Sequence, residues 1–219
     1  MKKFTSVLFA VAVFFLIITF AIRIPIDIRP VYYAHINAYD LPEYSGYSYE
    51  EIREAYDEVL DYLTKPGAEF GTGKMEHSVS GAKHFTDCKK LFALNYTVFY
   101  ISAIAVGTLI VLKKMGKTED YKLGRFSSGF WGALAAIVVP MLLALMVCID
   151  FDSAFYVFHF IFFPGNDDWI FDPRYDEIIN VMPPEFFMNC GIIIGAVVLL
   201  VSSAIIITEL AKRKRSNNN

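Results

Sequence analysis

Charged residues are missing from four long stretches of the sequence, and their absence excludes an ordinary soluble domain. The stretches cover residues 4–22, 91–112, 126–149 and 186–208, and none of them contains Asp, Glu, Lys, Arg or His. In a soluble protein, apolar residues alternate with polar ones at regular spacing and do not form runs of this length. About 20 apolar residues are enough for a helix to cross roughly 30 Å of hydrocarbon. We therefore predict four membrane-spanning helices.

Acidic residues are scarce on one side of the predicted membrane, whereas they outnumber basic residues on the other side. Four crossings leave both termini on one side, which holds 11 basic and 3 acidic residues; the opposite side takes 9 basic and 20 acidic residues. Lysine and arginine in short loops are retained in the cytoplasm. We therefore expect both termini in the cytoplasm. The histidines are then expected outside the cell or at the outer interface: His35, His77, His84 and His159.

Cysteine is also rare, and the common signatures of metal sites and hydrolases are absent. Cys148 and Cys190 lie near the outer ends of the third and fourth predicted spans, where a disulfide is possible but a role as small apolar filler is favoured. No Cys-x-x-Cys or His-Glu-x-x-His spacing occurs, which argues against a metal site. No Gly-x-Ser-x-Gly turn and no outward-facing basic patch with aromatic residues occur, which argues against a serine hydrolase and a nucleic-acid partner.

The predicted spans divide the chain into eight segments. We expect a mainly α-helical, integral membrane four-helix bundle with a small extracellular cap domain. The cytoplasmic segments are too small for a catalytic domain, so functional residues are expected outside. The spans are predicted over 1–22, 91–112, 126–149 and 186–208, the cap domain over 23–90, a cytoplasmic loop over 113–125, an extracellular or interfacial aromatic segment over 150–185, and a cytoplasmic tail over 209–219.

The predicted cap domain begins with an alternating segment over 23–33 that contains two prolines, a pattern that favours an extended edge strand. Ser48 and Glu51 form a capping box at the start of a helix, and Lys65-Pro66-Gly67 predicts its end. Apolar residues follow the helical period between these points, and the acidic residues on the opposite face are expected to be solvated. A further helix is predicted from about Ala82 into the second span.

Two histidines are the main candidates for chemistry. Asp87 follows His84 by one helical turn, and a carboxylate at that spacing can accept a hydrogen bond from the ring, fix its tautomer and raise its basicity. His159 lies within the aromatic run 155–163, where an apolar setting disfavours the charged imidazole, so this ring is expected to stay neutral and able to accept a proton. Both histidines are close to a span at the same membrane face, so helix packing can bring them together.

Other candidate residues have weaker support. Arg23 and Arg174 lie near the outer headgroup layer, where a guanidinium can bind a carboxylate, a phosphate or an oxyanion but more often anchors the interface. Ser80 shares a helix face with His84 and Asp87, yet one straight helix gives poor geometry for a nucleophile. A metal site would draw on residues that do not fit the His-Glu-x-x-His spacing: His77, His84, Asp87, Asp152 and His159. The supporting candidates are Asp87, Glu76, Arg23, Asp152 and Arg174.

Several blocks of the sequence resemble the lipoprotein intramolecular transacylases. The resemblance covers nearly the whole chain in order, and the Phe-His-x-x-Phe-Phe-Pro-Gly block over 158–165 is its most specific part. Where the family pattern is His-Met-x-Asp-Val-Lys, this chain has Phe85 and Cys88 in place of Met and Val, which are apolar or small changes. The blocks that carry the resemblance are 49–52, 62–63, 76–77, 84–89, 158–169, 172–173 and 184–187.

The resemblance implies an acyltransferase of the bacterial cell membrane, with its active site at the extracellular face. Its implied substrate is a diacylglyceryl-modified lipoprotein in membrane lipid, whose sn-2 acyl chain moves to the α-amine of the N-terminal cysteine and leaves the lyso form. The two family histidines correspond to His84 and His159. Because amine and ester belong to one molecule, the enzyme needs no cofactor and has only to orient them and move protons. We favour His84 as base and His159 as acid, and the reverse assignment stays open.

Two other functions stay open at this point. The chain is alternatively a non-enzymatic four-span sensor or transporter accessory protein, in which both histidines tolerate substitution. It is alternatively a membrane lipid-ester hydrolase, which removes an acyl chain from its substrate instead of relocating it.

Overall fold

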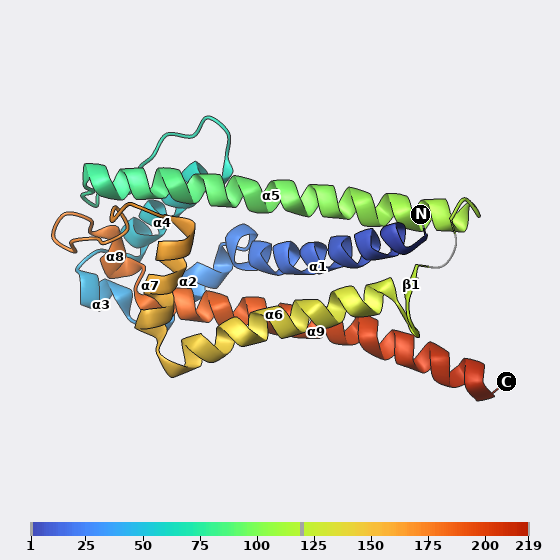
Figure 1. Ribbon diagram of the computed structural model, residues 1–219. Helices are drawn as coiled ribbons and strands as arrows, with labels where there is room; N and C mark the ends of the chain where they lie inside the picture. The colour runs from blue at the N-terminus through green and yellow to red at the C-terminus, as the bar shows by residue number, and fades with distance from the viewer. Residues whose placement is uncertain (1, 119–120, 219) are drawn as a thin grey trace. The chain divides into compact units, whose positions relative to one another are not determined.

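The computed structural model describes residues 2–118 and 121–218, apart from the side chains of residues 2, 143, 146–148 and 218. This part of the chain is mainly helical, and β1 pairs antiparallel with β2 in a short hairpin (Figure 1). The elements follow in the order α1 (Lys2–Asp27), α2 (Pro30–Ala38), α3 (Leu41–Ser45), α4 (Tyr49–Thr64), α5 (Val79–Lys114), β1 (Lys122–Leu123), β2 (Phe126–Ser127), α6 (Ser128–Ile149), α7 (Phe151–Phe162), α8 (Ile178–Val181) and α9 (Pro184–Asn218).

Helices α1, α5 and α9 are long and apolar enough to cross a membrane, judged by length and composition. They contain the first, second and fourth predicted spans. In α6, the apolar stretch Ser128–Leu142 is shorter than a full span. Several side chains in the rest of α6, including that of Cys148, lie outside the described residues. The crossing by 126–149 therefore stays a prediction, and the alternative roles of Cys148, disulfide partner of Cys190 or small apolar filler, fall outside the described residues.

The described chain forms two compact units, and the first contains most of the apolar helical length. It comprises Met1–Arg23, Asn95–Met146 and Ile193–Asn219. A Cβ atom at Gly132 of α6 would lie only 2.4 Å from the backbone oxygen of Ala10 in α1, so only glycine permits this approach. Membrane helices commonly associate through such small residues, which let their backbones come close.

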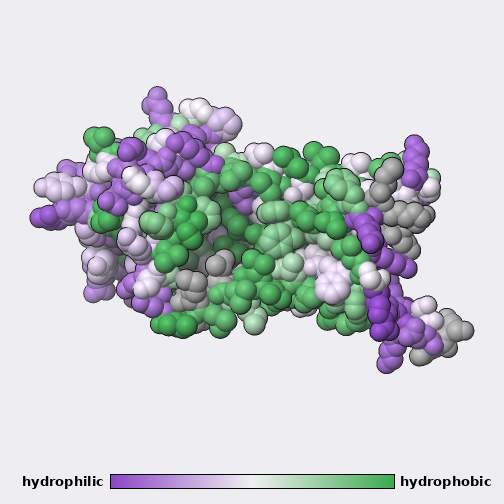
Figure 2. Space-filling view, viewed as in Figure 1, coloured by the Kyte–Doolittle hydropathy of each residue, from purple (hydrophilic) through white to green (hydrophobic). Residues whose placement is uncertain are grey.

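Large apolar side chains cover the surface of the first unit. Figure 2 shows them as a broad hydrophobic area over the long helices. Ile104 is 68% exposed and Leu200 is 72% exposed. A soluble monomer rarely presents so extended an apolar surface to water, so this surface is suited to contact with lipid tails.

The second unit comprises Ile24–Leu94 and Val147–Ile192, so most of the predicted cap domain and the predicted aromatic segment fold together. Its core is formed by the apolar faces of α2, α4 and α8. The predicted capping box at Ser48 and Glu51 is confirmed, and α4 ends at Thr64 as the Lys65-Pro66-Gly67 pattern predicted. The most deeply buried side chains of this core include Tyr32, Ile36, Ile52, Val59, Ile178 and Val181.

The strand predicted over 23–33 is wrong, because this segment is helical. Helix α1 continues to Asp27, and α2 begins at Pro30. Proline at the first helical position breaks no hydrogen bond, and its fixed φ suits a helix. Tyr32 and Ile36, one helical turn apart, are both fully buried, so burial of a helical face decides the conformation.

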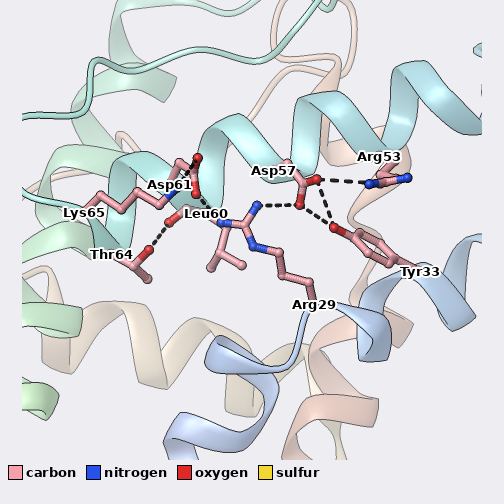
Figure 3. A network of polar contacts seen from close by, with 8 residues as sticks. All are labelled: Arg29, Tyr33, Arg53, Asp57, Leu60, Asp61, Thr64 and Lys65. Carbon is pink, nitrogen blue, oxygen red and sulfur yellow. Dashed lines mark hydrogen bonds and ion pairs between the residues drawn. The ribbon is translucent and has the colours of Figure 1, made fainter.

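Arg29, between α1 and α2, binds the acidic face of α4 (Figure 3). Its guanidinium donates to Asp57 at 2.7 Å and also to Asp61, and the hydroxyl of Tyr33 donates to Asp57 at 2.8 Å. The acidic face that was predicted to be solvated is therefore partly used to hold α2 against α4.

Candidate active site

The structure brings the two predicted histidines together within the second unit. His84 lies near the start of α5, and His159 lies near the end of α7. The centroids of their rings are 5.6 Å apart, and the two residues are only 6% and 5% exposed. On α7 the exposed neighbours of His159 are apolar, whereas the histidine itself points inward. An imidazole pair at this separation can exchange protons with one substrate molecule placed beside the rings.

Aromatic side chains surround both rings. Phe163 packs edge-on against His84 with a centroid distance of 4.7 Å, and Phe171 does so at 5.5 Å. The ring of Trp169 stacks on His159 at 4.4 Å with an interplanar angle of 24°. These residues keep water away from the imidazoles, so each ring is held in a medium that disfavours charge.

Both histidines are consequently neutral at physiological pH. The pKa of His84 is lowered to about 4, mainly by burial and also by the neighbouring His159, while the charges of Asp87 and Asp168 act in the opposite direction. Burial also lowers the pKa of His159. A neutral imidazole carries one N–H donor and one lone pair, so each ring can give or accept a proton depending on its tautomer.

The tautomer of His159 is set by a hydrogen bond within its own helix. Its Nδ1 lies 2.7 Å from the backbone oxygen of Phe155, one turn earlier in α7. A carbonyl oxygen only accepts hydrogen bonds, so Nδ1 carries the proton and the lone pair is on Nε2. The nitrogen of His159 that is left for a reacting molecule is therefore a proton acceptor.

The neighbours of His84 differ from those predicted. Its Nε2 lies 3.4 Å from the sulfur of Cys88, and its buried Nδ1 has no hydrogen-bond partner among the described residues. The predicted hydrogen bond between Asp87 and this ring is wrong, because the Asp87 carboxylate accepts from Lys90 at 2.7 Å and from Asn166 at 3.2 Å. Asp87 instead holds the loop after α7 through Asn166, and it acts on His84 through charge alone.

The remaining predicted candidates have no contact with either histidine ring among those described above. Arg23 belongs to the first unit, where its guanidinium lies 4.4 Å from the ring centroid of Phe99. Arg174 is exposed and pairs with the carboxylate of its neighbour Asp172. Asp152 is exposed in the first turn of α7. Glu76 is exposed in the loop before α5.

Two acidic residues that sequence reasoning missed fasten this loop. Asp176 is 3% exposed and accepts from the backbone N–H of Ser78 at 2.9 Å and from its hydroxyl at 2.8 Å. Glu177 accepts from the backbone N–H of Glu76 at 2.7 Å and from Tyr47 at 2.6 Å. These bonds fix where α5 begins and thereby position His84. No local pattern signals them, because donor and acceptor are about 100 residues apart.

Replacement of Gly81 tests this fastening. In Gly81→Ala the new Cβ would lie 2.2 Å from Oδ1 of Asp176, which its bonds to Ser78 prevent from moving away. We expect a loss of about 1–3 kcal/mol in the free energy of unfolding, as for other overpacked sites. Gly107→Ala in the same helix is the control, because nothing lies within 4 Å of its Cβ position. The measurement is thermal unfolding in detergent. Equal unfolding temperatures for Gly81→Ala and Gly107→Ala would contradict the prediction.

Comparisons with known proteins agree with these observations. The sequence model described as Lipoprotein intramolecular transacylase Lit matches residues 7–187. The in meso structure of the membrane integral lipoprotein intramolecular transacylase Lit from Bacillus cereus is 26% identical to this chain, with a TM-score of 0.86, and the match covers 99% of this chain and 98% of that one.

A second structure of the Bacillus cereus protein, with a histidine-to-alanine mutation, is 24% identical and shares the fold with a TM-score of 0.82, over 100% of this chain and 96% of that one. A search of the curated proteins gives no match. The family match extends over most of the sequence and includes both His84 and His159. The chain therefore belongs to the lipoprotein intramolecular transacylase Lit family, and it is a membrane-integral acyltransferase.

Proposed function

We propose that this protein moves the sn-2 acyl chain of a diacyl bacterial lipoprotein to the α-amine of its N-terminal cysteine, which gives the lyso form. The observation that carries the proposal is the pair of buried, neutral imidazoles whose ring centroids are 5.6 Å apart. The reaction needs one group that accepts a proton and one that donates a proton, and it needs both in the same place. The substrate supplies the nucleophile and the acyl group, so no cofactor is required.

The atoms balance without a second reactant. The lone pair of the neutral amine attacks the sn-2 carbonyl carbon, so a C–N bond forms while the ester C–O bond breaks. The nitrogen loses one proton to an imidazole base, and the departing glycerol oxygen receives one proton from an imidazole acid. The product is an isomer of the substrate. Proton return between the two rings restores the enzyme for the next turnover.

The hydrogen bond of His159 favours a different division of roles from the one expected from the sequence. With Nδ1 bonded to the Phe155 carbonyl, Nε2 offers a lone pair, so we assign the base to His159. His84 is then the acid that protonates the glycerol oxygen. Holding amine and ester together can contribute about 7–11 kcal/mol to lowering the barrier, and each proton transfer contributes about 10²–10⁴-fold.

The charge distribution supports the placement of this site outside the cell. The predicted cytoplasmic segments hold 11 of the 20 basic residues but only 3 of the 23 acidic residues. We therefore retain four crossings with both termini in the cytoplasm. His84 precedes the second predicted span by only two helical turns, a height of about 10 Å, which is within reach of a lipid-anchored cysteine at the extracellular leaflet.

A synthetic lipopeptide with an S-diacylglyceryl cysteine and a free α-amine tests the proposal with purified protein in micelles. We expect a product of unchanged mass in which one acyl chain resists mild alkaline hydrolysis, because an amide survives conditions that cleave esters. Mass spectrometry before and after alkali measures both properties. A product lighter by one acyl chain would indicate a hydrolase, and an unmodified peptide would favour the sensor or accessory protein. The His84→Ala His159→Ala double variant controls for spontaneous migration.

A further inference from the structure

The contact between His84 and Cys88 bears on how the proposed acid is prepared. The two residues are one turn apart on α5, so their side chains meet on the same face of the helix. The distance from the Cys88 sulfur to Nε2 of His84 is 3.4 Å. The other ring nitrogen, Nδ1, is buried without a partner among the described residues. One nitrogen is thus engaged by the protein itself, and the other has no hydrogen-bond partner among the described residues.

We propose that Cys88 is a positioning residue, whose thiol donates a hydrogen bond to Nε2 of His84 and thereby keeps the ring proton on Nδ1. The tautomer of His84 is a property of the resting protein and does not depend on the proposed function. Only the expected effect of Cys88 on the rate rests on the proposed acyl transfer.

The direction of the hydrogen bond follows from the chemistry of the two groups. Burial raises the pKa of the Cys88 thiol to about 12, so the sulfur keeps its proton at neutral pH and is not a nucleophile. A sulfur atom is a weak acceptor, whereas the lone pair of a neutral imidazole nitrogen is a good one. The arrangement S–H to Nε2 therefore uses the better acceptor. The reverse arrangement would direct the N–H of Nε2 at the weakly accepting sulfur and leave Nδ1 with a lone pair in place of the N–H that the proposed acid needs.

The two histidines then present complementary nitrogens. His159 exposes a lone pair on Nε2, because its Nδ1–H is bound to the Phe155 carbonyl. His84 presents N–H at Nδ1, because its Nε2 is occupied by the Cys88 thiol. One ring is set to accept the amine proton and the other to donate to the glycerol oxygen. Without the thiol, both rings would be free to offer lone pairs, and a fraction of the protein would lack its proton donor.

The charged and titratable groups that act on His84 do not replace this role. Asp87 is engaged by Lys90 and Asn166, and Asp168 is paired with Lys83 at 2.6 Å. His159 contributes a ring contact at 5.6 Å between centroids. None of these contacts is a hydrogen bond to Nε2, so among the described residues the thiol is the group that selects the tautomer.

The test is the ¹⁵N NMR spectrum of the His84 ring in full-length protein in micelles. The wild type is expected to show a protonated Nδ1 and an unprotonated Nε2. Cys88→Ser keeps a donor and should retain this signature, whereas Cys88→Ala should shift the protonation toward Nε2. Cys190→Ala is the matched control, because this second partly buried cysteine packs against the core of the same unit and should leave the signature unchanged.

Activity provides a second readout. Cys88→Ala is expected to lower kcat about tenfold with KM unchanged, the size of effect that one hydrogen bond supports, and Cys88→Ser should recover most of the loss. A wild-type ring protonated on Nε2, or an alanine variant with an unaltered ¹⁵N signature, would overturn the proposal even if acyl transfer proceeds. If the wild type shows no acyl transfer, the proposed function fails while the NMR result still decides the role of Cys88.

Discussion

His159→Asn is expected to reduce the rate of acyl transfer by about 10²–10⁴-fold, the range that a positioned proton acceptor contributes. The asparagine amide can still donate to the Phe155 carbonyl that now binds Nδ1 of the histidine. It has no basic nitrogen at the place of Nε2, so no group accepts the proton that the amine nitrogen must lose as the C–N bond forms. The loss should fall on kcat, because the surrounding aromatic side chains that would hold the lipid are unchanged.

The measurement is the initial rate of conversion of the diacyl lipopeptide, compared with His84→Ala and with His77→Ala. His77 is an exposed histidine whose Nδ1 lies 3.0 Å from the hydroxyl of Thr72, so its removal should leave the rate nearly unchanged. His77→Ala should unfold near the wild-type temperature, whereas His84→Ala leaves a cavity and should unfold at a lower temperature, so rates are compared where every variant is folded. A folded His159→Asn protein with more than about a tenth of the wild-type rate would refute the assignment of His159 as base.

The apolar helices could be predicted from sequence because their cause is local. A run such as 186–208 has no charged residue, and burial in lipid requires a helix whatever the rest of the chain does. The segment 23–33 could not be predicted in this way. Its alternation of apolar and polar residues matches the period of a strand. Tyr32 and Ile36 are nevertheless buried against partners as distant in sequence as Val181, and this burial favours a helix.

The candidate site divides in a similar way. His84 and His159 could be selected because each lies near a predicted span on the same side, so topology alone limits their separation. Their hydrogen-bond partners could not be chosen, because several groups on α5 lie within one turn of His84. The sequence indicates Asp87 as the partner because a carboxylate one turn away can accept from the ring, yet Asn166 and Lys90 compete for that carboxylate. Because the Asp87 carboxylate is occupied, the His84 ring contacts the thiol of Cys88 instead.

The buried His84 is also expected to make the stability of the protein depend on pH in a defined direction. Its pKa is about 4 in the folded protein, below the value of 6.5 of a free side chain. Above pH 6.5 the ring is neutral in both the folded and the unfolded state, and no stability is lost. As the pH falls below 6.5, the unfolded chain takes up a proton that the folded protein excludes. The resulting loss should reach up to about 3 kcal/mol near pH 4.

The variant His84→Phe isolates this contribution. It keeps an aromatic ring among Phe163 and Phe171 and removes both the titration and the unpartnered Nδ1. Carboxylates distant from His84 titrate in both proteins, so they largely cancel in the difference between wild type and variant. The free energy of unfolding in micelles, followed from about pH 7 to about pH 4.5, should fall more steeply for the wild type. Parallel curves would mean that the folded protein admits the proton at His84 as readily as the unfolded chain. The ring would then lie in water, and it would not be the neutral donor that the reaction requires.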